Sequence, residues 1–129
     1  MNKLIVVITL LLVTGCKSTT WSVIDGSKSK IGDNNNYDVL ITSIDGKRFF
    51  DTLKYRKIEP GFRYLQLTST NPKVSDKYVT KPFAIMAKPC VKYFVTANQK
   101  NNNKNESDNW VVKVIGEEKI PSCEKYIKE

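Results

Sequence analysis

The sequence predicts an all-β fold, a small single-domain antiparallel β-sandwich of about 6–7 strands with one disulfide. From residue 37 onward, short runs rich in Val, Ile, Tyr, Phe and Leu are separated by Gly, Pro, Asn and Asp. No stretch repeats apolar residues at helical spacing, apart from a short turn expected over residues 122–128. These observations favour strands joined by turns.

The expected strands share a β-prone composition and turn residues at their ends, and they are residues 37–44, 48–51, 53–58, 62–69, 83–87, 90–97 and 110–115. The first is followed by Asp45-Gly46, a hairpin signal because Gly tolerates the positive φ of primed turns. Pro60-Gly61 marks a second turn.

Alternation within the later runs predicts which side chains share a face. In 62–69, Leu65 and Leu67 lie on one face, while Phe62 and Tyr64 lie on the other. Tyr93 and Val95 likewise share one face of their strand, and Trp110 leads the last strand. Two polar stretches, 70–81 and 98–109, are expected to be loops because they hold little or no apolar surface to bury.

The first sixteen residues combine a positively charged start, an apolar run over 4–13 and small residues before a cysteine. The last four are Val-Thr-Gly-Cys, ending at Cys16, and they resemble the lipobox of bacterial lipoproteins. That resemblance implies removal of residues 1–15 as a signal peptide, diacylation of the Cys16 sulfur and acylation of the new amino group. A transmembrane helix is the first alternative, but the run is about half the ~20 apolar residues that spanning needs. A secreted protein with a plain thiol at Cys16 is the second.

Several acyl chains hold a protein firmly, whereas one chain gives only reversible binding. We therefore expect a protein attached to the membrane through an N-terminal lipid anchor. In the lipoprotein family the residue after the cysteine guides sorting, and here it is Lys17 rather than the Asp that favours inner-membrane retention. The resemblance thus implies the periplasmic face of the outer membrane.

The domain organisation follows from this processing. Residues 1–15 are the signal peptide, 16–36 the lipidated N-terminus with a flexible tether, and 37–129 the β-sandwich domain. The tether is rich in Ser, Thr, Gly, Lys and Asn, and residues 21–24 could add at most a short edge strand. A mature chain of 129 − 15 = 114 residues fits one domain.

With Cys16 assigned to lipid, Cys90 and Cys123 remain as a pair in an oxidising compartment, which predicts a disulfide. Two buried free thiols are the alternative. A metal site is not expected, because the chain has no His and no Cys-x-x-Cys spacing. The sequence indicates no cofactor.

The chain is basic, with 21 Lys and Arg against 13 Asp and Glu. Removing Lys3 with the signal peptide leaves a net charge of 20 − 13 = +7, which favours anionic partners through long-range steering. Simple solubility is the competing interpretation. No nucleic-acid motif is present, and an exported protein is not expected to meet nucleic acid.

One cluster stands out as a possible binding surface: Arg48, Tyr55, Arg56 and Lys57, close in sequence to several aromatic residues. Tyr, Phe and Arg are enriched in interface cores. The competing interpretation is that the aromatic residues here, with Phe62 and Tyr64, are ordinary sandwich core.

A second resemblance lies in the mature domain. Asp45-Gly46-Lys47 and the stretch 60–67, Pro-Gly-Phe-Arg-Tyr-Leu-Gln-Leu, are similar to PEGA-like β-sandwich modules. Pro89-Cys90, Tyr93, Trp110 and Cys123 also match a pattern of small uncharacterised proteobacterial lipoproteins. These relatives imply an envelope-associated binding or structural role and carry no chemistry over.

Catalysis by Ser/His/Asp or Cys/His groups is excluded because this chain has no His, so we do not expect an enzyme. The favoured function is a non-enzymatic, lipid-anchored cell-envelope protein that binds another periplasmic component, an envelope protein or an anionic polymer. The alternatives are a structural lipoprotein of a secretion or assembly machine and a periplasmic lysozyme-type inhibitor. The inhibitor is disfavoured because animal lysozymes are basic too.

Overall fold

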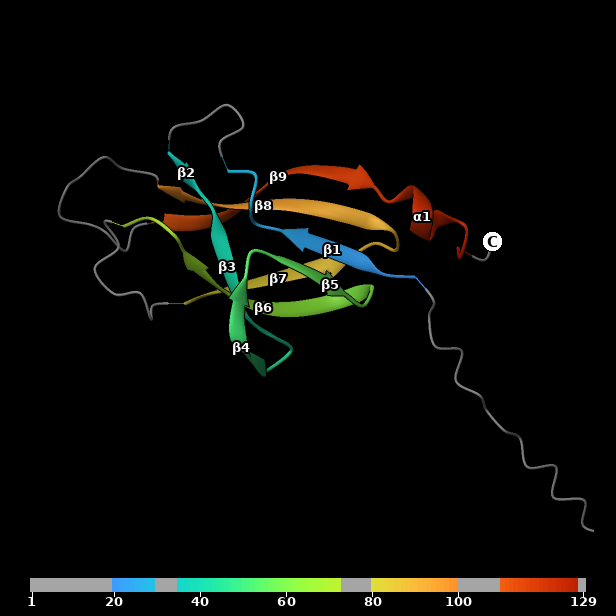
Figure 1. Cartoon of the computed structure of the whole chain (residues 1–129), viewed down its shortest axis with the longest axis horizontal. Helices are drawn as coiled ribbons and strands as arrows, with labels where there is room; N and C mark the ends of the chain where they lie inside the picture. Colours follow the sequence, from blue (N-terminus) through green and yellow to red (C-terminus); the bar gives the residue numbers. More distant parts are fainter. Residues whose placement is uncertain (1–19, 30–34, 73–79, 100–109, 128–129) are drawn as a thin grey trace, which may run out of the picture.

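The computed structural model describes residues 20–29, 35–72, 80–99 and 110–127. Within these ranges it contains nine strands and one short helix, arranged as two facing sheets (Figure 1). In chain order they are β1 (Ser22–Asp25), β2 (Asn36–Tyr37), β3 (Val39–Ile44), β4 (Lys47–Leu53), β5 (Tyr55–Ile58), β6 (Gly61–Ser69), β7 (Lys81–Ala87), β8 (Val91–Gln99), β9 (Trp110–Lys119) and α1 (Pro121–Glu124). The predicted small all-β sandwich is confirmed.

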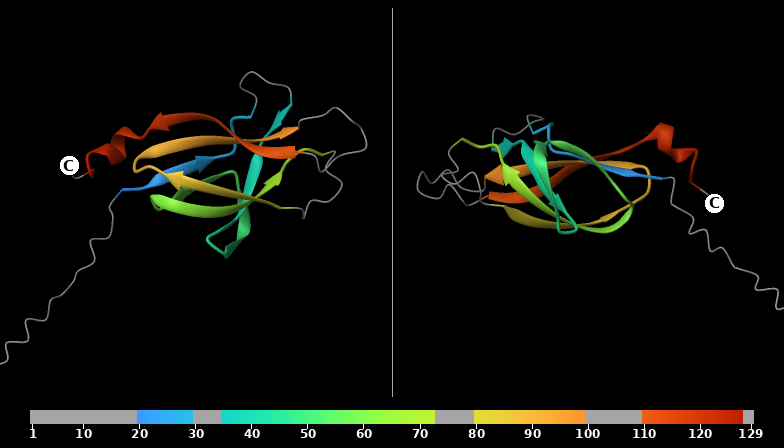
Figure 2. Two further views of the ribbon diagram at one scale, coloured as in Figure 1. Left: turned by 180° about the vertical axis from the view of Figure 1, so that it is seen from behind. Right: turned by 60° about the horizontal axis from the view of Figure 1, so that its bottom comes forward.

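Strand β8 is the centre of one sheet, here called the β8 sheet. It pairs with β9 along one edge and with β1 and β2 along the other, and β5 follows β1. The second sheet, the β6 sheet, has the order β4-β3-β6-β7. Among the described pairs only β1 and β8 run parallel. Figure 2 shows the two layers from behind and from below.

Strand β1 corrects the predicted domain boundary. Residues 22–25 were expected in a tether over 16–36, with at most an edge strand, yet β1 lies between β8 and β5 inside the β8 sheet. Val23 and Ile24 are buried completely. The predicted tether is therefore wrong at these residues. The segment is only four residues long and polar on both sides, but pairing on both edges satisfies its backbone N–H and C=O groups and makes it a stable strand. The domain therefore begins by Ser22, and residues 16–19 and 30–34 of the expected tether lie outside the described residues.

Backbone contacts hold β1 at both ends. At its start, Cys90 N–H donates to Trp21 O at 2.8 Å. Beyond its end, Gly26 N–H donates to Lys54 O at 2.6 Å and Gly26 O accepts from Val39 N–H at 3.0 Å. A Cβ at Gly26 would overlap Val39 Cγ2 and lie 2.6 Å from Val39 O, so only glycine fits this crossing.

The predicted disulfide is confirmed. Cys90 and Cys123 are bonded, with a Cα–Cα separation of 5.3 Å, and the bond holds α1 against the start of β8. Cys123 Sγ also lies 3.3 Å from Trp21 N, so the same corner contacts the start of β1. The chain segments around β1, β8 and α1 are thereby joined at one end of the sandwich.

The Asp45-Gly46 hairpin also has the expected conformation, with φ of 49° and 84° at the two turn residues. The segment after it differs from expectation in one respect. β4 belongs to the β6 sheet and β5 to the β8 sheet, so the chain crosses between the layers at Lys54. The two strands beyond the seven expected runs are β1 and β2.

The core lies between the two sheets and draws on nearly every strand. Its buried members are Ile24, Val39, Ile41, Ile58, Leu65, Leu67, Ala87, Tyr93, Val95, Ala97 and Trp110. The shared faces predicted for Leu65 with Leu67 on β6 and for Tyr93 with Val95 on β8 are confirmed by this set, in which all four residues are buried. Arg63, whose strand position faces inward, ends at the rim, where its Nη1 donates to Asp45 Oδ2 at 2.8 Å.

Replacing Ile24 by Ala tests the place of β1 in the core. We expect the free energy of unfolding in urea to fall by about 2–5 kcal/mol, because a buried methyl-rich side chain is lost from a packed site. Val111→Ala, at an exposed position on β9, is the control and should change it by less than about 1 kcal/mol. If both substitutions lower the free energy of unfolding by the same small amount, β1 is not part of the core and residues 22–25 belong to a tether.

Candidate interaction surface

The predicted binding cluster is divided by the fold. Arg48 lies on β4 in the β6 sheet, whereas Tyr55, Arg56 and Lys57 lie on β5 in the β8 sheet. Within β5 the side chains alternate, so Tyr55 and Lys57 face outward while Arg56 faces the same side as buried Ile58. Of the four residues, therefore, only Tyr55 and Lys57 share an outward face of one strand, and Arg56 does not take part in it.

Arg56 links the two layers at the side where β4 and β5 are the outer strands. Its Nη2 donates to Asp51 Oδ1 at 2.8 Å and to Asp51 O at 2.9 Å. Its guanidinium carbon lies 3.6 Å from the centroid of the Phe49 ring, and the side chain is only 16% exposed. The hydrogen bond from Arg56 lowers the pKa of the Asp51 carboxyl. Arg56 is thus engaged within the fold.

The outward lysines of the β8 sheet lie against aromatic rings. Lys57 Nζ is 4.7 Å from the centroid of the Trp21 ring, and Lys92 Nζ is 5.6 Å from that of Tyr55. Both lysines flank Val23 in register, and Val23 is buried although it lies on the outer face. The lysine stems therefore cover this sheet, as long amphipathic side chains commonly do.

Asp38 is another charged residue whose side chain is bonded within the fold. Its carboxylate accepts hydrogen bonds from Ser29 and from Lys54 Nζ, the latter at 2.9 Å. Burial raises the pKa of Asp38, but the bonds from Ser29 and Lys54 outweigh it and leave the pKa below its ordinary value. This carboxylate fastens the segment after β1 to the β4–β5 crossing.

The outer face of β6 and β7 differs from the lysine-covered outer face of the β8 sheet, because its side chains are all uncharged and most of them are apolar. In this β6–β7 face three cross-strand pairs stand side by side, Phe62 with Met86, Tyr64 with Ala84, and Gln66 with Pro82. Phe62 is 61% exposed and Met86 is 65% exposed. Exposed apolar patches on a soluble domain mark interaction sites, and interface cores are depleted of charge and enriched in aromatic residues and Met.

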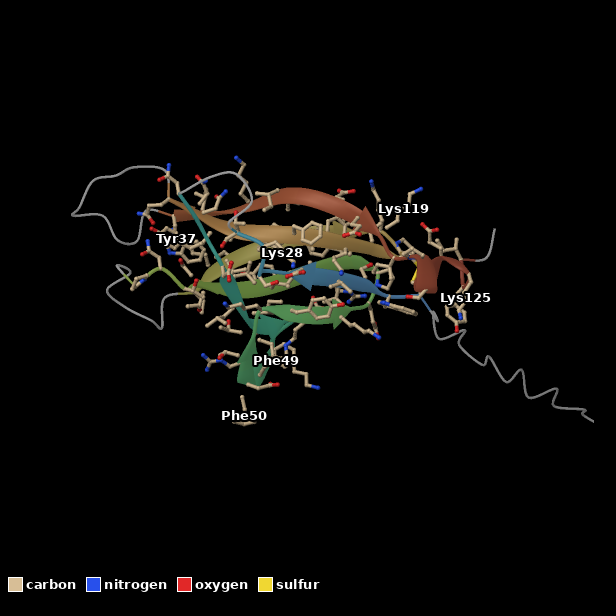
Figure 3. The ribbon with its side chains drawn as sticks, turned by 45° about the horizontal axis from the view of Figure 1, so that its top comes forward. Lys28, Tyr37, Phe49, Phe50, Lys119 and Lys125 are labelled. Atoms are coloured by element: carbon tan, nitrogen blue, oxygen red, sulfur yellow. A yellow bond between two sulfur atoms is a disulfide. The ribbon has the colours of Figure 1, made fainter. Side chains whose placement is uncertain are left out.

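The alternation that predicts Phe62 and Tyr64 on one face of β6 is confirmed. They lie outside rather than in the core, and Met86 and Ala84, which alternate in the same way on β7, complete the face. Phe50, in the middle of β4, is also fully exposed (Figure 3), but it stands on a different strand from this face.

Other kinds of site find no support in the described parts of the chain. These residues nowhere bring together three side chains of the kinds that ligate metals. The helix found there is far too short to cross a bilayer. Cys16, the expected lipidation site, lies outside the described residues.

Comparison of the chain with protein-family models, with curated proteins and with solved structures finds no match. The two resemblances drawn from the sequence therefore stay predictions. The β6–β7 face is defined by the geometry of this chain alone.

Alanine substitutions of Arg56 and Lys57 test whether Arg56, unlike the exposed Lys57, stabilises the fold. Arg56→Ala should lower the free energy of unfolding by about 1–3 kcal/mol, because it removes hydrogen bonds to a carboxylate and packing on Phe49. Lys57→Ala should change it by less than about 1 kcal/mol, because it removes only an exposed contact with the Trp21 ring. Urea unfolding of both variants measures the difference. If Arg56→Ala proves as mild as Lys57→Ala, Arg56 does not link the sheets.

Proposed function

We propose that this chain is a non-enzymatic, lipid-anchored protein of the cell envelope that binds another envelope protein through its β6–β7 face. The anchor rests on the lipobox-like residues before Cys16. The binding role rests on one observation, the exposed and uncharged face formed by β6 and β7. The mature chain has a net charge of +7, and an exposed apolar face on such a charged domain lowers its solubility, so the face is best explained by a contact with a partner.

A protein partner fits this face better than an anionic polymer does. A polymer of negative charge requires free cations on the surface that it contacts, and the six side chains of the face provide none. Two of the outward lysines, Lys57 and Lys92, lie against aromatic rings on the other sheet. Steering by the overall positive charge can speed the approach of an acidic partner without forming the contact itself.

The anchor is tested by the intact mass of the protein purified from bacterial membranes. We expect a chain that begins at Cys16 and exceeds the polypeptide mass by a diacylglyceryl group and a further fatty acyl group. Cys16→Ser should lack both additions. A mature wild-type protein with a free thiol, or one that still carries residues 1–15, would refute lipidation at this position.

The face is tested by a photo-crosslinking amino acid placed at Phe62 in living cells. A discrete protein adduct is expected, and Met86→Glu, which adds a charge beside position 62, should weaken it at least about tenfold. Val111→Glu introduces the same charge at an exposed apolar position on β9 and should leave the adduct unchanged. An adduct that is absent, or that both substitutions affect equally, contradicts binding through the β6–β7 face.

A further inference from the structure

One end of the sandwich gathers aromatic rings and lysines around the start of β1. At this end β1 begins, β9 ends and α1 follows (Figure 1). We call it the β1 pole and define it by Trp21, Lys57, Lys119, Lys125 and Tyr126. The rings of Trp21 and Tyr126 have centroids 6.2 Å apart and are inclined at 49°. The Cys90–Cys123 disulfide and its contact with Trp21 hold these elements together.

Each ring of the β1 pole is accompanied by a cation. Lys57 Nζ lies 4.7 Å from the Trp21 ring centroid, and Lys125 Nζ lies 5.0 Å from that of Tyr126. Tyr126 is 41% exposed and Ile127 is 45% exposed. Lys119 and Lys125 point from the same end (Figure 3). Trp, Tyr and Lys side chains with this mixed character are enriched where water meets lipid headgroups.

The acidic side chains at this end do not cancel the lysines. Glu59, in the β5–β6 turn, lies 3.6 Å from Arg63 Nη2 and is partly neutralised there. Glu124 on α1 precedes Lys125 directly. Lys88, in the β7–β8 turn beside Cys90, adds a further exposed cation. Glu117 and Glu118 precede Lys119 on β9, and Glu118 lies opposite Lys92 in register. These four carboxylates are outnumbered by six positive groups at the same end, Lys57, Arg63, Lys88, Lys92, Lys119 and Lys125.

Because the domain begins by Ser22, the distance between the β1 pole and an acylated Cys16 is limited by the few residues between them. Only residues 17–20 separate Cys16 from Trp21. At ~3.5 Å per residue, five steps of extended chain reach at most ~18 Å. A tether extending to residue 36 would allow the domain to stand free of the membrane, whereas this short segment keeps the β1 pole beside the headgroups.

We propose that the β1 pole docks on the anionic phospholipid surface that holds the Cys16 lipids, an inference that rests on the proposed lipidation. Trp21 and Tyr126 lie at headgroup level, and Lys57 and Lys125 contact lipid phosphates. Because the pole is formed by strand ends, both sheets then stand upright on the membrane. The β6–β7 face then runs away from the membrane, with its Phe62–Met86 pair nearest the lipid and its Gln66–Pro82 pair farthest from it.

The test uses the lipidated protein reconstituted in vesicles of phosphatidylethanolamine and phosphatidylglycerol, with phosphatidylcholine vesicles for comparison. Brominated phospholipid should quench Trp21 fluorescence in the anionic vesicles and much less in the neutral ones. The other tryptophan, Trp110, is buried, so Trp21→Phe should remove the quenching. Lys57→Glu with Lys125→Glu should lower the ratio of docked to free domain at least about tenfold.

The matched control reverses two exposed lysines elsewhere, Lys28 beyond the far end of β1 and Lys113 in β9, and should preserve quenching. Circular dichroism and thermal unfolding establish that all variants are folded. Intact mass distinguishes the two claims. Lipid on Cys16 without Trp21 quenching overturns docking alone, and absence of lipid overturns the anchor as well. Quenching that is equal in both vesicle types and unchanged by Lys57→Glu with Lys125→Glu overturns the assignment to anionic lipid.

Discussion

The rest of the structure depends on the burial of β1 between β5 and β8. This four-residue strand joins β5 to the β8 sheet and places Ile24 in the core. Its start is fixed by Trp21 against the Cys90–Cys123 corner, and its end by the crossing of Gly26 over Val39. Without β1, the described part of β5 would have no strand partner, and the contacts of Arg56 with Phe49 and Asp51 would lose their support.

The same strand organises the surface. On the outer face of the β8 sheet, Lys57 and Lys92 flank the buried Val23 and lie against the rings of Trp21 and Tyr55. The outer face of β6 and β7 stays free of charge. A domain with these two unlike surfaces is suited to contact two unlike neighbours, lipid at the β1 pole and protein at the β6–β7 face.

Local sequence patterns predicted the features that depend on neighbouring residues. The Asp45-Gly46 turn and the alternation through Leu65 and Leu67 follow from turn chemistry and strand period. At residues 21–24 at most a short edge strand was expected. The central place of β1 could not be predicted, because its partners, residues 55–58 and 92–94, are distant in sequence and its flanks are polar. Arg56 was misplaced because its inward direction depends on β5 joining the other sheet. The alternation of side chains along β6 was evident from the sequence. Both faces of this strand carry large apolar residues, however, so the pattern did not show which face is exposed to water.

Amide hydrogen exchange of the full chain tests the central claim, that β1 is an integral strand and not part of a tether. The amides of Val23, Ile24 and Asp25 are the ones to follow, with those of Tyr93 and Val95 in β8 as the internal reference. The account predicts that backbone amides of β1 bonded to β5 or β8 exchange as slowly as those of β8, because both open only when the sheet does. Exchange of the whole 22–25 segment at the rate of an unstructured peptide, while β8 remains protected, would contradict it.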